Sequence, residues 1–80
     1  MDRVIIERTA VEAAKELSLK CNLVYAFQER ELIDSKAWLI NFYMEDEDVK
    51  QLRIQVDATT DRVSLKETIK RELSSRFSSV

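Results

Sequence analysis

The sequence predicts a two-layer α+β domain in which a helix, a three-stranded antiparallel meander and a second helix follow one another over residues 1–80. Three observations favour this fold class. Apolar residues recur with helical spacing near both ends of the chain, they alternate with a period of two over residues 37–58, and 80 residues suffice for a single domain. Packing the helices on the sheet would bury the apolar side of each.

The first helix is expected over residues 1–20. Its small and apolar residues recur at three- and four-residue spacing and form a stripe of Ala10, Ala13, Ala14 and Leu17. The start of this helix is open between two residues. Thr9 and Glu12 fit a capping box, whereas a start at Asp2 would place residues 4–6 inside the helix.

Residues 22–30 fit either a strand or a continuation of the first helix. The helical alternative rests on the spacing of positions 17, 21, 24 and 28, and the strand rests on β-favouring residue types in alternation. We favour the strand and expect Leu23, Tyr25 and Phe27 to share its core-facing side. A turn over residues 31–36, with Asp34 and Ser35 at its tip, then leads to the next strand.

Two strands joined by an acidic turn are expected over residues 37–58. One side of this hairpin carries alternating apolar residues and is the expected core: Trp38, Ile40, Phe42, Met44, Leu52, Ile54 and Val56. The turn from Glu45 to Asp48 is a run of carboxylates, but it lacks the ligand spacing, central glycine and distal glutamate of an EF-hand loop. We interpret it as a solvated tip that discourages edge pairing, and we predict no metal site.

The second helix is expected from Ser64 onward, after a turn at residues 59–61. Ser64 and Glu67 fit a second capping box. A narrow apolar stripe follows at helical spacing: Leu65, Ile69, Leu73 and Phe77. This stripe predicts which side of the helix faces the core.

The run Val56-Asp57-Ala58-Thr59-Thr60, which closes the third expected strand, resembles the closing motif of the PepSY domain family. Such domains have a helix rich in Ala and Glu, and then a three-stranded meander that ends in a Val-Asp-Ala-x-Thr-Gly turn. The likeness runs from the helix at 9–20 to about Val63. Asp61 stands where the family has glycine, and the helix from Ser64 lies outside the family pattern. The resemblance implies a non-catalytic module that restrains or binds a peptidase or another partner.

The composition excludes several kinds of active site. The chain has no glycine, no proline and no histidine, so it has no Walker loop, no G-x-G-x-x-G turn and no Ser-His or Cys-His nucleophilic pair. Cys21 is the single cysteine and lies on the apolar stripe, where we expect an inert, buried thiol. We therefore predict that the protein is not an enzyme and uses no cofactor.

Charge and hydropathy predict a cytoplasmic protein that binds no membrane, and they do not favour a nucleic-acid partner. The net charge of −2, with both signs interspersed, gives no electrostatic case for nucleic acid. Glu67 and Glu72 interleave with the basic residues of the last helix, which indicates a solvated face. A single cysteine favours a reducing compartment, and no apolar run has the length of a signal peptide or a membrane span.

The outer face of the sheet is the expected binding surface. Its side chains are too apolar for a fully solvated face: Val24, Ala26, Leu39, Asn41, Tyr43, Arg53 and Gln55. Either one helix covers each face and closes the monomer, or both helices lie on one face and leave the other for a partner.

We predict a small protein-interaction or regulatory module that homodimerises through this outer face or through an edge strand. The expected partner-binding residues are Val24, Leu39, Asn41, Tyr43, Arg53 and Gln55. A nucleic-acid-associated protein and a PepSY-like module that restrains a peptidase are the alternatives.

Overall fold

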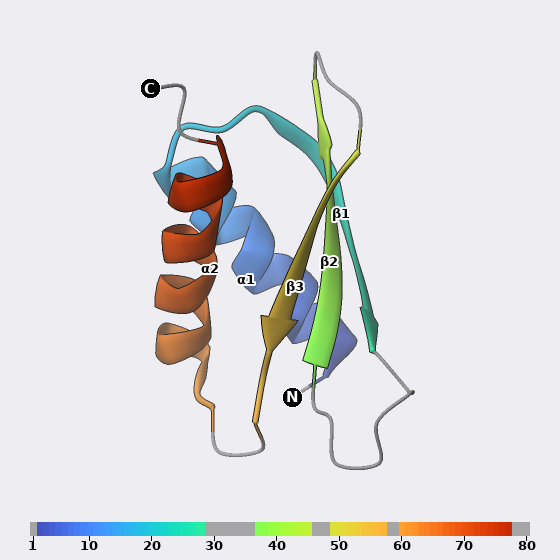
Figure 1. Ribbon diagram of the computed structural model, residues 1–80, viewed down its shortest axis with the longest axis vertical. Coiled ribbons are helices and arrows are strands. Elements are labelled where there is room, and N and C mark those ends of the chain that lie inside the picture. The colour runs from blue at the N-terminus through green and yellow to red at the C-terminus, as the bar shows by residue number, and fades with distance from the viewer. Residues whose placement is uncertain (1, 29–36, 46–48, 58–59, 78–80) are drawn as a thin grey trace.

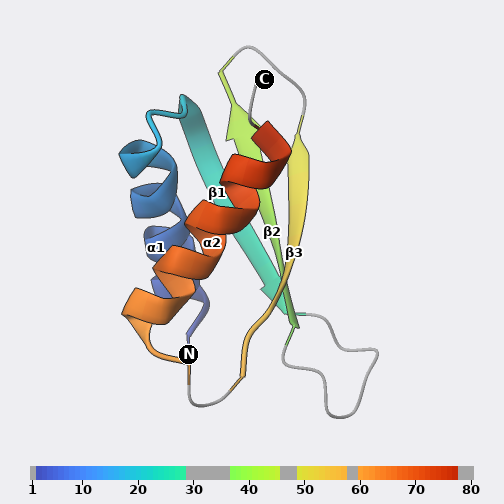
Figure 2. The same cartoon turned by 60° about the vertical axis from the view of Figure 1, so that its left-hand side comes forward.

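The computed structural model describes residues 2–28, 37–45, 49–57 and 60–77, and within them the chain has the predicted α+β architecture. The elements follow in the order α1 (Arg3–Glu16), β1 (Cys21–Gln28), β2 (Ala37–Met44), β3 (Lys50–Gln55) and α2 (Arg62–Phe77). Both helices lie on the same face of the sheet (Figure 1 and Figure 2). Of the two arrangements that the sequence left open, the structure has the one with an uncovered sheet face.

The sheet is an antiparallel meander in the order β1-β2-β3, so β1 and β3 are its edge strands. Ala26 of β1 lies opposite Ile40 of β2, which in turn lies opposite Leu52 of β3. This row is fully covered by the helices. The predicted turn tip at Asp34 and Ser35, and the acidic run after Glu45, lie outside the described residues.

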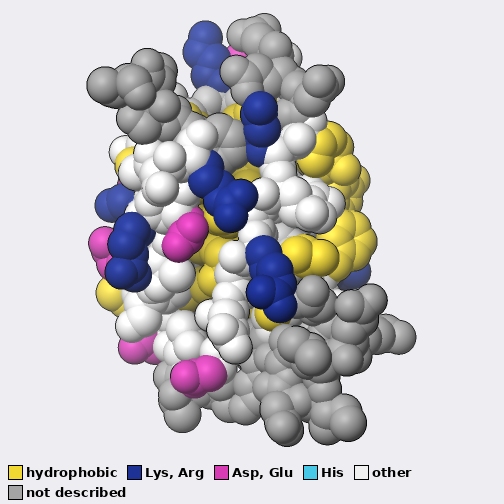
Figure 3. Space-filling view, viewed as in Figure 1, with side chains coloured by type: hydrophobic (Ala, Val, Ile, Leu, Met, Phe, Trp, Pro, Cys, Tyr) yellow, Lys and Arg dark blue, Asp and Glu magenta, His cyan; other side chains and the backbone are white. Residues whose placement is uncertain are grey.

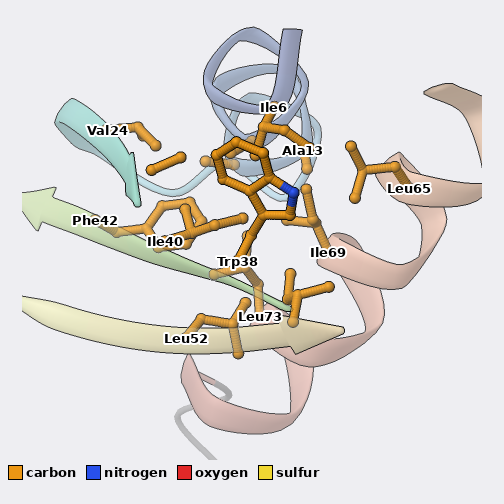
Figure 4. Packing of buried hydrophobic residues seen from close by; sticks show 14 of the residues in the cluster. Ile6, Ala13, Val24, Trp38, Ile40, Phe42, Leu52, Leu65, Ile69 and Leu73 are labelled. Carbon is orange, nitrogen blue, oxygen red and sulfur yellow. The ribbon is translucent and has the colours of Figure 1, made fainter. Parts of the chain in front are cut away.

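The core lies between the sheet and the two helices, and Trp38 is at its centre (Figure 4). The indole of Trp38 reaches from β2 toward Ile6 of α1 and Ile69 of α2, and 8% of the residue is exposed. The predicted stripe of α2 is buried at each position whose side chain the structure describes: Leu65, Ile69 and Leu73. On the predicted core side of the hairpin, Met44 is only partly buried, and the other six residues are buried: Trp38, Ile40, Phe42, Leu52, Ile54 and Val56.

The start of α1 is at Asp2, which settles the choice between two N-caps. The Asp2 carboxylate accepts a hydrogen bond from the backbone N–H of Val4 at 3.3 Å. Thr9 instead lies inside the helix, where its buried hydroxyl donates to the carbonyl oxygen of Ile5 at 2.7 Å. A start at Asp2 allows Ile6 to enter the core as part of the helical stripe.

The interpretation as a strand is confirmed for residues 22–28, and residues 29–30 lie outside the described residues, but the predicted orientation of the strand is wrong. Val24 and Ala26 face the helices and are 5% and 1% exposed, whereas Tyr25 and Phe27 face outward and are 43% and 51% exposed. The physical reason is the helix above β1. The side of α1 that enters the core is lined by small alanines, and a helix that approaches a strand this closely leaves room for small side chains beneath it.

The predicted capping box at Ser64 and Glu67 is also wrong, because α2 begins earlier. The Asp61 carboxylate accepts a hydrogen bond from the backbone N–H of Ser64 at 2.7 Å, so Asp61 caps the helix and Ser64 lies in its first turn. Hydrogen bonding from Ser64 lowers the pKa of the Asp61 carboxyl. The cap thus keeps a negative charge at the positive end of the helix dipole.

Ion pairs connect the two helices across their exposed sides. The Glu16 carboxylate lies 2.6 Å from the Nζ of Lys66 and 3.5 Å from that of Lys70, and Glu12 pairs with Arg62. The hydrogen bond from Lys66 lowers the pKa of Glu16, and the same bond raises the pKa of Lys66. Because these groups are exposed to solvent, the pairs help to orient α2 on α1 more than they stabilise the fold.

Ser18 ends α1 in a conformation that usually requires glycine. Its φ angle is 59°, in the left-handed region. The N–H of Leu19 donates to the carbonyl of Ala14 at 2.9 Å, and that of Ser18 donates to Lys15 at 3.0 Å, which together form a Schellman motif. A chain without glycine therefore turns from α1 into β1 through a strained serine.

Replacing this serine by glycine should stabilise the protein. We expect Ser18→Gly to raise the free energy of unfolding by up to about 1 kcal/mol, because relief of the left-handed strain exceeds the added entropy of the unfolded chain. Ser64→Gly is the matched control, since the same change inside α2 should lower stability. Urea unfolding measures both variants. A lower free energy of unfolding for Ser18→Gly than for the wild type would contradict the inference that Ser18 is strained.

Candidate protein-binding surface

The uncovered side of the sheet, which we call the outer face, is built from alternate residues of all three strands. It consists of Leu23, Tyr25 and Phe27 from β1, Leu39, Asn41 and Tyr43 from β2, and Gln51, Arg53 and Gln55 from β3. The strand register sets these side chains in rows. One row runs from Tyr25 through Asn41 to Gln51, and the next runs from Phe27 through Leu39 to Arg53.

Apolar and aromatic side chains gather on the β1 side of the outer face. Leu23, Tyr25 and Phe27 are each about half exposed, and hydrophobic side chains cluster on the side of the molecule where β1 lies (Figure 3). Tyr25 and Tyr43 pack edge to face, with ring centroids 5.6 Å apart and an interplanar angle of 86°. This arrangement leaves parts of an aromatic pair in contact with water, which is unfavourable without a covering partner.

Polar side chains occupy the β3 side of the same face. The Nε2 of Gln51 donates to the Oδ1 of Asn41 at 3.1 Å, so this row is internally hydrogen-bonded. Arg53 lies opposite Leu39 and is exposed. The outer face is therefore divided along the strands into an apolar half and a polar half.

The structure brings five of the six predicted partner-binding residues together on the outer face: Leu39, Asn41, Tyr43, Arg53 and Gln55. The prediction is wrong for Val24. It lies in the core beneath α1 and points toward the helices (Figure 4), so it cannot contact a partner on the outer face.

Sequence reasoning missed the three residues that dominate this surface: Leu23, Tyr25 and Phe27. The signal that could have placed them was the size of their neighbours. Val24 and Ala26 are the small members of the alternation, and α1 presents alanines to whatever it packs on.

A groove runs between α1 and the free edge of β1. It has a volume of about 490 Å³ and is lined by Val4, Glu7, Arg8, Val11, Glu12 and Lys15 from α1 and by Asn22, Leu23 and Val24 from β1. At one point the helix reaches the strand directly, since the Glu7 carboxylate accepts a hydrogen bond from the N–H of Ala26 at 3.2 Å.

Cys21 lies at the start of β1 with a half-buried thiol. Its Sγ donates a weak hydrogen bond to the carbonyl of Leu23 at 3.4 Å. Burial raises the pKa of this thiol, which keeps it protonated and poorly nucleophilic at neutral pH. Among the described residues, no three carboxylate or thiol side chains are grouped so that they could hold a metal ion.

Comparison of the chain with protein-family models, with curated proteins and with solved structures finds no significant match. The resemblance to the PepSY family therefore stays a prediction, and part of its closing motif, residues 58–59, lies outside the described ranges. Within the part of the chain that the structure describes, neither helix has the length and apolar character that a bilayer span requires.

The orientation of β1 can be tested by placing the same charge on its two sides. Val24→Asp should lower the free energy of unfolding by more than about 3 kcal/mol, because it buries a carboxylate without a partner. Phe27→Asp, three residues along the strand, should cost about 1 kcal/mol, since this side chain is already half in water. Urea unfolding of both variants measures the difference. Equal losses, or a larger loss at Phe27, would contradict the orientation.

Proposed function

We propose that this protein is a small, non-catalytic protein-interaction module that self-associates in pairs through its outer face. The observation that carries the proposal is the row of Leu23, Tyr25 and Phe27, each about half exposed on a sheet face that neither α1 nor α2 covers. Exposed apolar rows of this kind are typical of protein-binding surfaces.

A second copy fits this face because the face is divided into two halves. When two sheets pack face to face with their strands nearly aligned, apolar halves can meet in the centre while polar halves remain at the rim. Tyr43 and Leu39 would extend the apolar contact of the β1 row, and Arg53 and Gln55 would lie at the rim. A two-fold axis through the apolar half satisfies both copies with the same residues.

The size of the apolar row indicates weak pairing. From the area that aromatic side chains bury, the exposed parts of the row amount to about 300 Å² per protomer. A standard stable interface buries about 800 Å² on each partner. We therefore propose a pairing that depends on protein concentration and responds to it, as suits a regulatory module.

Several features support a role without catalysis. The nine residues of the outer face include no carboxylate, thiol or imidazole, and the raised pKa of Cys21 disfavours thiolate chemistry. The resemblance to PepSY domains is compatible with this role, because restraint of a peptidase is itself protein binding. A single cysteine in a small domain suits the reducing environment of the cytoplasm.

Self-association can be measured by analytical ultracentrifugation over a range of about 10 μM to 1 mM. We expect the average mass to rise from 9.4 kDa toward twice that value. Tyr25→Glu combined with Phe27→Glu should hold the protein at the monomer mass. Val63→Glu is the control, because Val63 is 73% exposed on α2, away from the sheet. A monomer at every concentration, or pairing that survives the double substitution, would overturn the proposal.

Binding of single-stranded nucleic acid is a second candidate, and the outward position of the β1 aromatics favours it. Exposed rings on a sheet can stack on unpaired bases, and Tyr25, Phe27 and Tyr43 are close together on one face. The net charge of −2 opposes this candidate, because phosphate contacts normally supply much of the affinity.

Fluorescence polarisation with a labelled single-stranded RNA at low salt tests this candidate. If the rings stack on bases, Phe27→Leu should reduce binding several-fold while the fold stays intact, because leucine keeps the apolar surface and removes the π face. Absence of binding at low salt would remove the candidate, since electrostatic attraction is strongest there.

A further inference from the structure

We propose that the free edge of β1, together with the groove beside α1, binds an extended acidic segment of another protein as a fourth strand of the sheet. This site shares Leu23 with the outer face, but the proposal does not depend on self-association. Four features carry it: an open strand edge, an uncharged strand, a groove with alternating chemistry, and unpaired basic side chains beside it.

The edge of β1 is open among the described residues. β1 pairs with β2 on one side, and on its other side the N–H of Ala26 is bonded to the Glu7 carboxylate instead of to a strand. In an antiparallel strand, alternate residues direct their N–H and C=O groups to the same side. The backbone groups of Val24 therefore lie on the same free edge as those of Ala26, ready to pair with an added strand.

The two edges of the sheet differ in their protection. β3 carries Lys50 and Arg53, and Arg76 of α2 donates to the carbonyl of Gln51 at 3.4 Å. Charged side chains and covered carbonyls of this kind discourage strand addition. β1, in contrast, has no charged residue in its eight positions. Strand addition is therefore favoured at β1.

The groove offers alternating apolar and basic side chains to an added strand. Val4, Arg8, Val11 and Lys15 follow one another along the side of α1 that lines it. Successive members of this series are three or four residues apart, which is about 4.5 to 6 Å along the helix axis. Side chains on one face of a strand recur every 6–7 Å or so, which is close enough for successive pairs to meet. In a matching extended segment, the side chains that face α1 would be apolar and acidic in turn. The apolar ones would meet the valines of α1, and the acidic ones would meet Arg8 and Lys15.

The charges of the groove favour an acidic segment. Glu7 is engaged by the N–H of Ala26 and lies 3.7 Å from the guanidinium of Arg3, and Glu12 pairs with Arg62. Arg8 and Lys15 are exposed and make no ion pair with any described residue. The positive charges at the groove are thus less neutralised than the negative ones, and a carboxylate in the added strand would complement them.

A lone strand fits this edge better than a second copy of the domain does. α1 packs on its own β1 (Figure 2), so pairing of β1 with β1 would bring two α1 helices together. Adjacent strands lie about 4.8 Å apart, whereas packed helices need about 8–10 Å. An extended segment without an attached helix avoids this conflict.

The contact from Glu7 to Ala26 gives the proposal a specific signature. An added strand would offer its own carbonyl to the N–H of Ala26, so Glu7 must release that group before the strand can pair. Removing the competing carboxylate with Glu7→Ala should therefore tighten binding by about 2- to 12-fold, which corresponds to one net hydrogen bond. Loss of a groove-lining side chain would ordinarily weaken binding.

The probe is a fluorescein-labelled peptide, Thr-Val-Thr-Glu-Thr-Val-Thr-Glu, followed by fluorescence polarisation. Its first control replaces both glutamates by lysine, and its second carries N-methyl groups on the amides of the pairing edge. We expect saturable binding of the acidic peptide, at least about tenfold weaker binding of the lysine peptide, and no binding of the methylated one. Arg8→Glu combined with Lys15→Glu should reverse the charge preference. Both residues are exposed, so the fold should tolerate this change.

Leu39→Glu combined with Tyr43→Glu separates this site from the outer face, because it places the charges on β2 and leaves β1 unchanged. Failure of self-association in this variant should leave peptide binding measurable. Amide shifts at Val24 and Ala26 in NMR spectra of the wild-type protein locate the bound peptide on the β1 edge. The proposal is overturned if the acidic peptide does not bind at millimolar concentration, if the methylated peptide binds equally well, or if charge reversal changes nothing.

Discussion

The close approach of α1 to β1 is the contact on which the surface of this protein depends. Ala10, Ala13 and Ala14 are fully buried, and the strand side that faces the helices carries Val24 and Ala26. Because a strand alternates its side chains, small residues beneath the helix require the large ones to point outward. The apolar row on the outer face is thus the counterpart of tight packing on the inner face. Core and outer face are set by the same contact.

The sequence predicted the elements better than it predicted how they face one another. The hairpin over 37–56 has large apolar residues on one side and mostly polar ones on the other, so its core side could be read directly. β1 is apolar on both sides, and a period of two does not say which side is inward. Which side of β1 faces the core depends on how closely α1 packs on the strand. This packing is a tertiary contact, and the alternation within the strand does not encode it. The sequence also left open whether the helices cover one face of the sheet or both, because that too depends on tertiary packing.

Helix starts were a second limit of sequence reasoning. Both predicted capping boxes lay inside helices that begin earlier, at Asp2 and Asp61. A serine or threonine followed three residues later by glutamate is a signature of helix starts, but here both pairs lie inside helices. In α1 the competing hydrogen bond is visible, since the Thr9 hydroxyl donates to a carbonyl of its own helix. Both helices are instead capped by an aspartate, whose charge also complements the helix dipole.

The division of the outer face has a consequence for the size of any assembly. A contact made by one patch with its own copy has two-fold symmetry and is complete when two chains have met. A contact between one edge and a different edge would instead repeat from chain to chain and grow without limit. β3 presents charges at its edge, and α1 stands beside β1. The fold thus opposes the open-ended route and leaves its apolar side chains where the proposed association would be self-limiting.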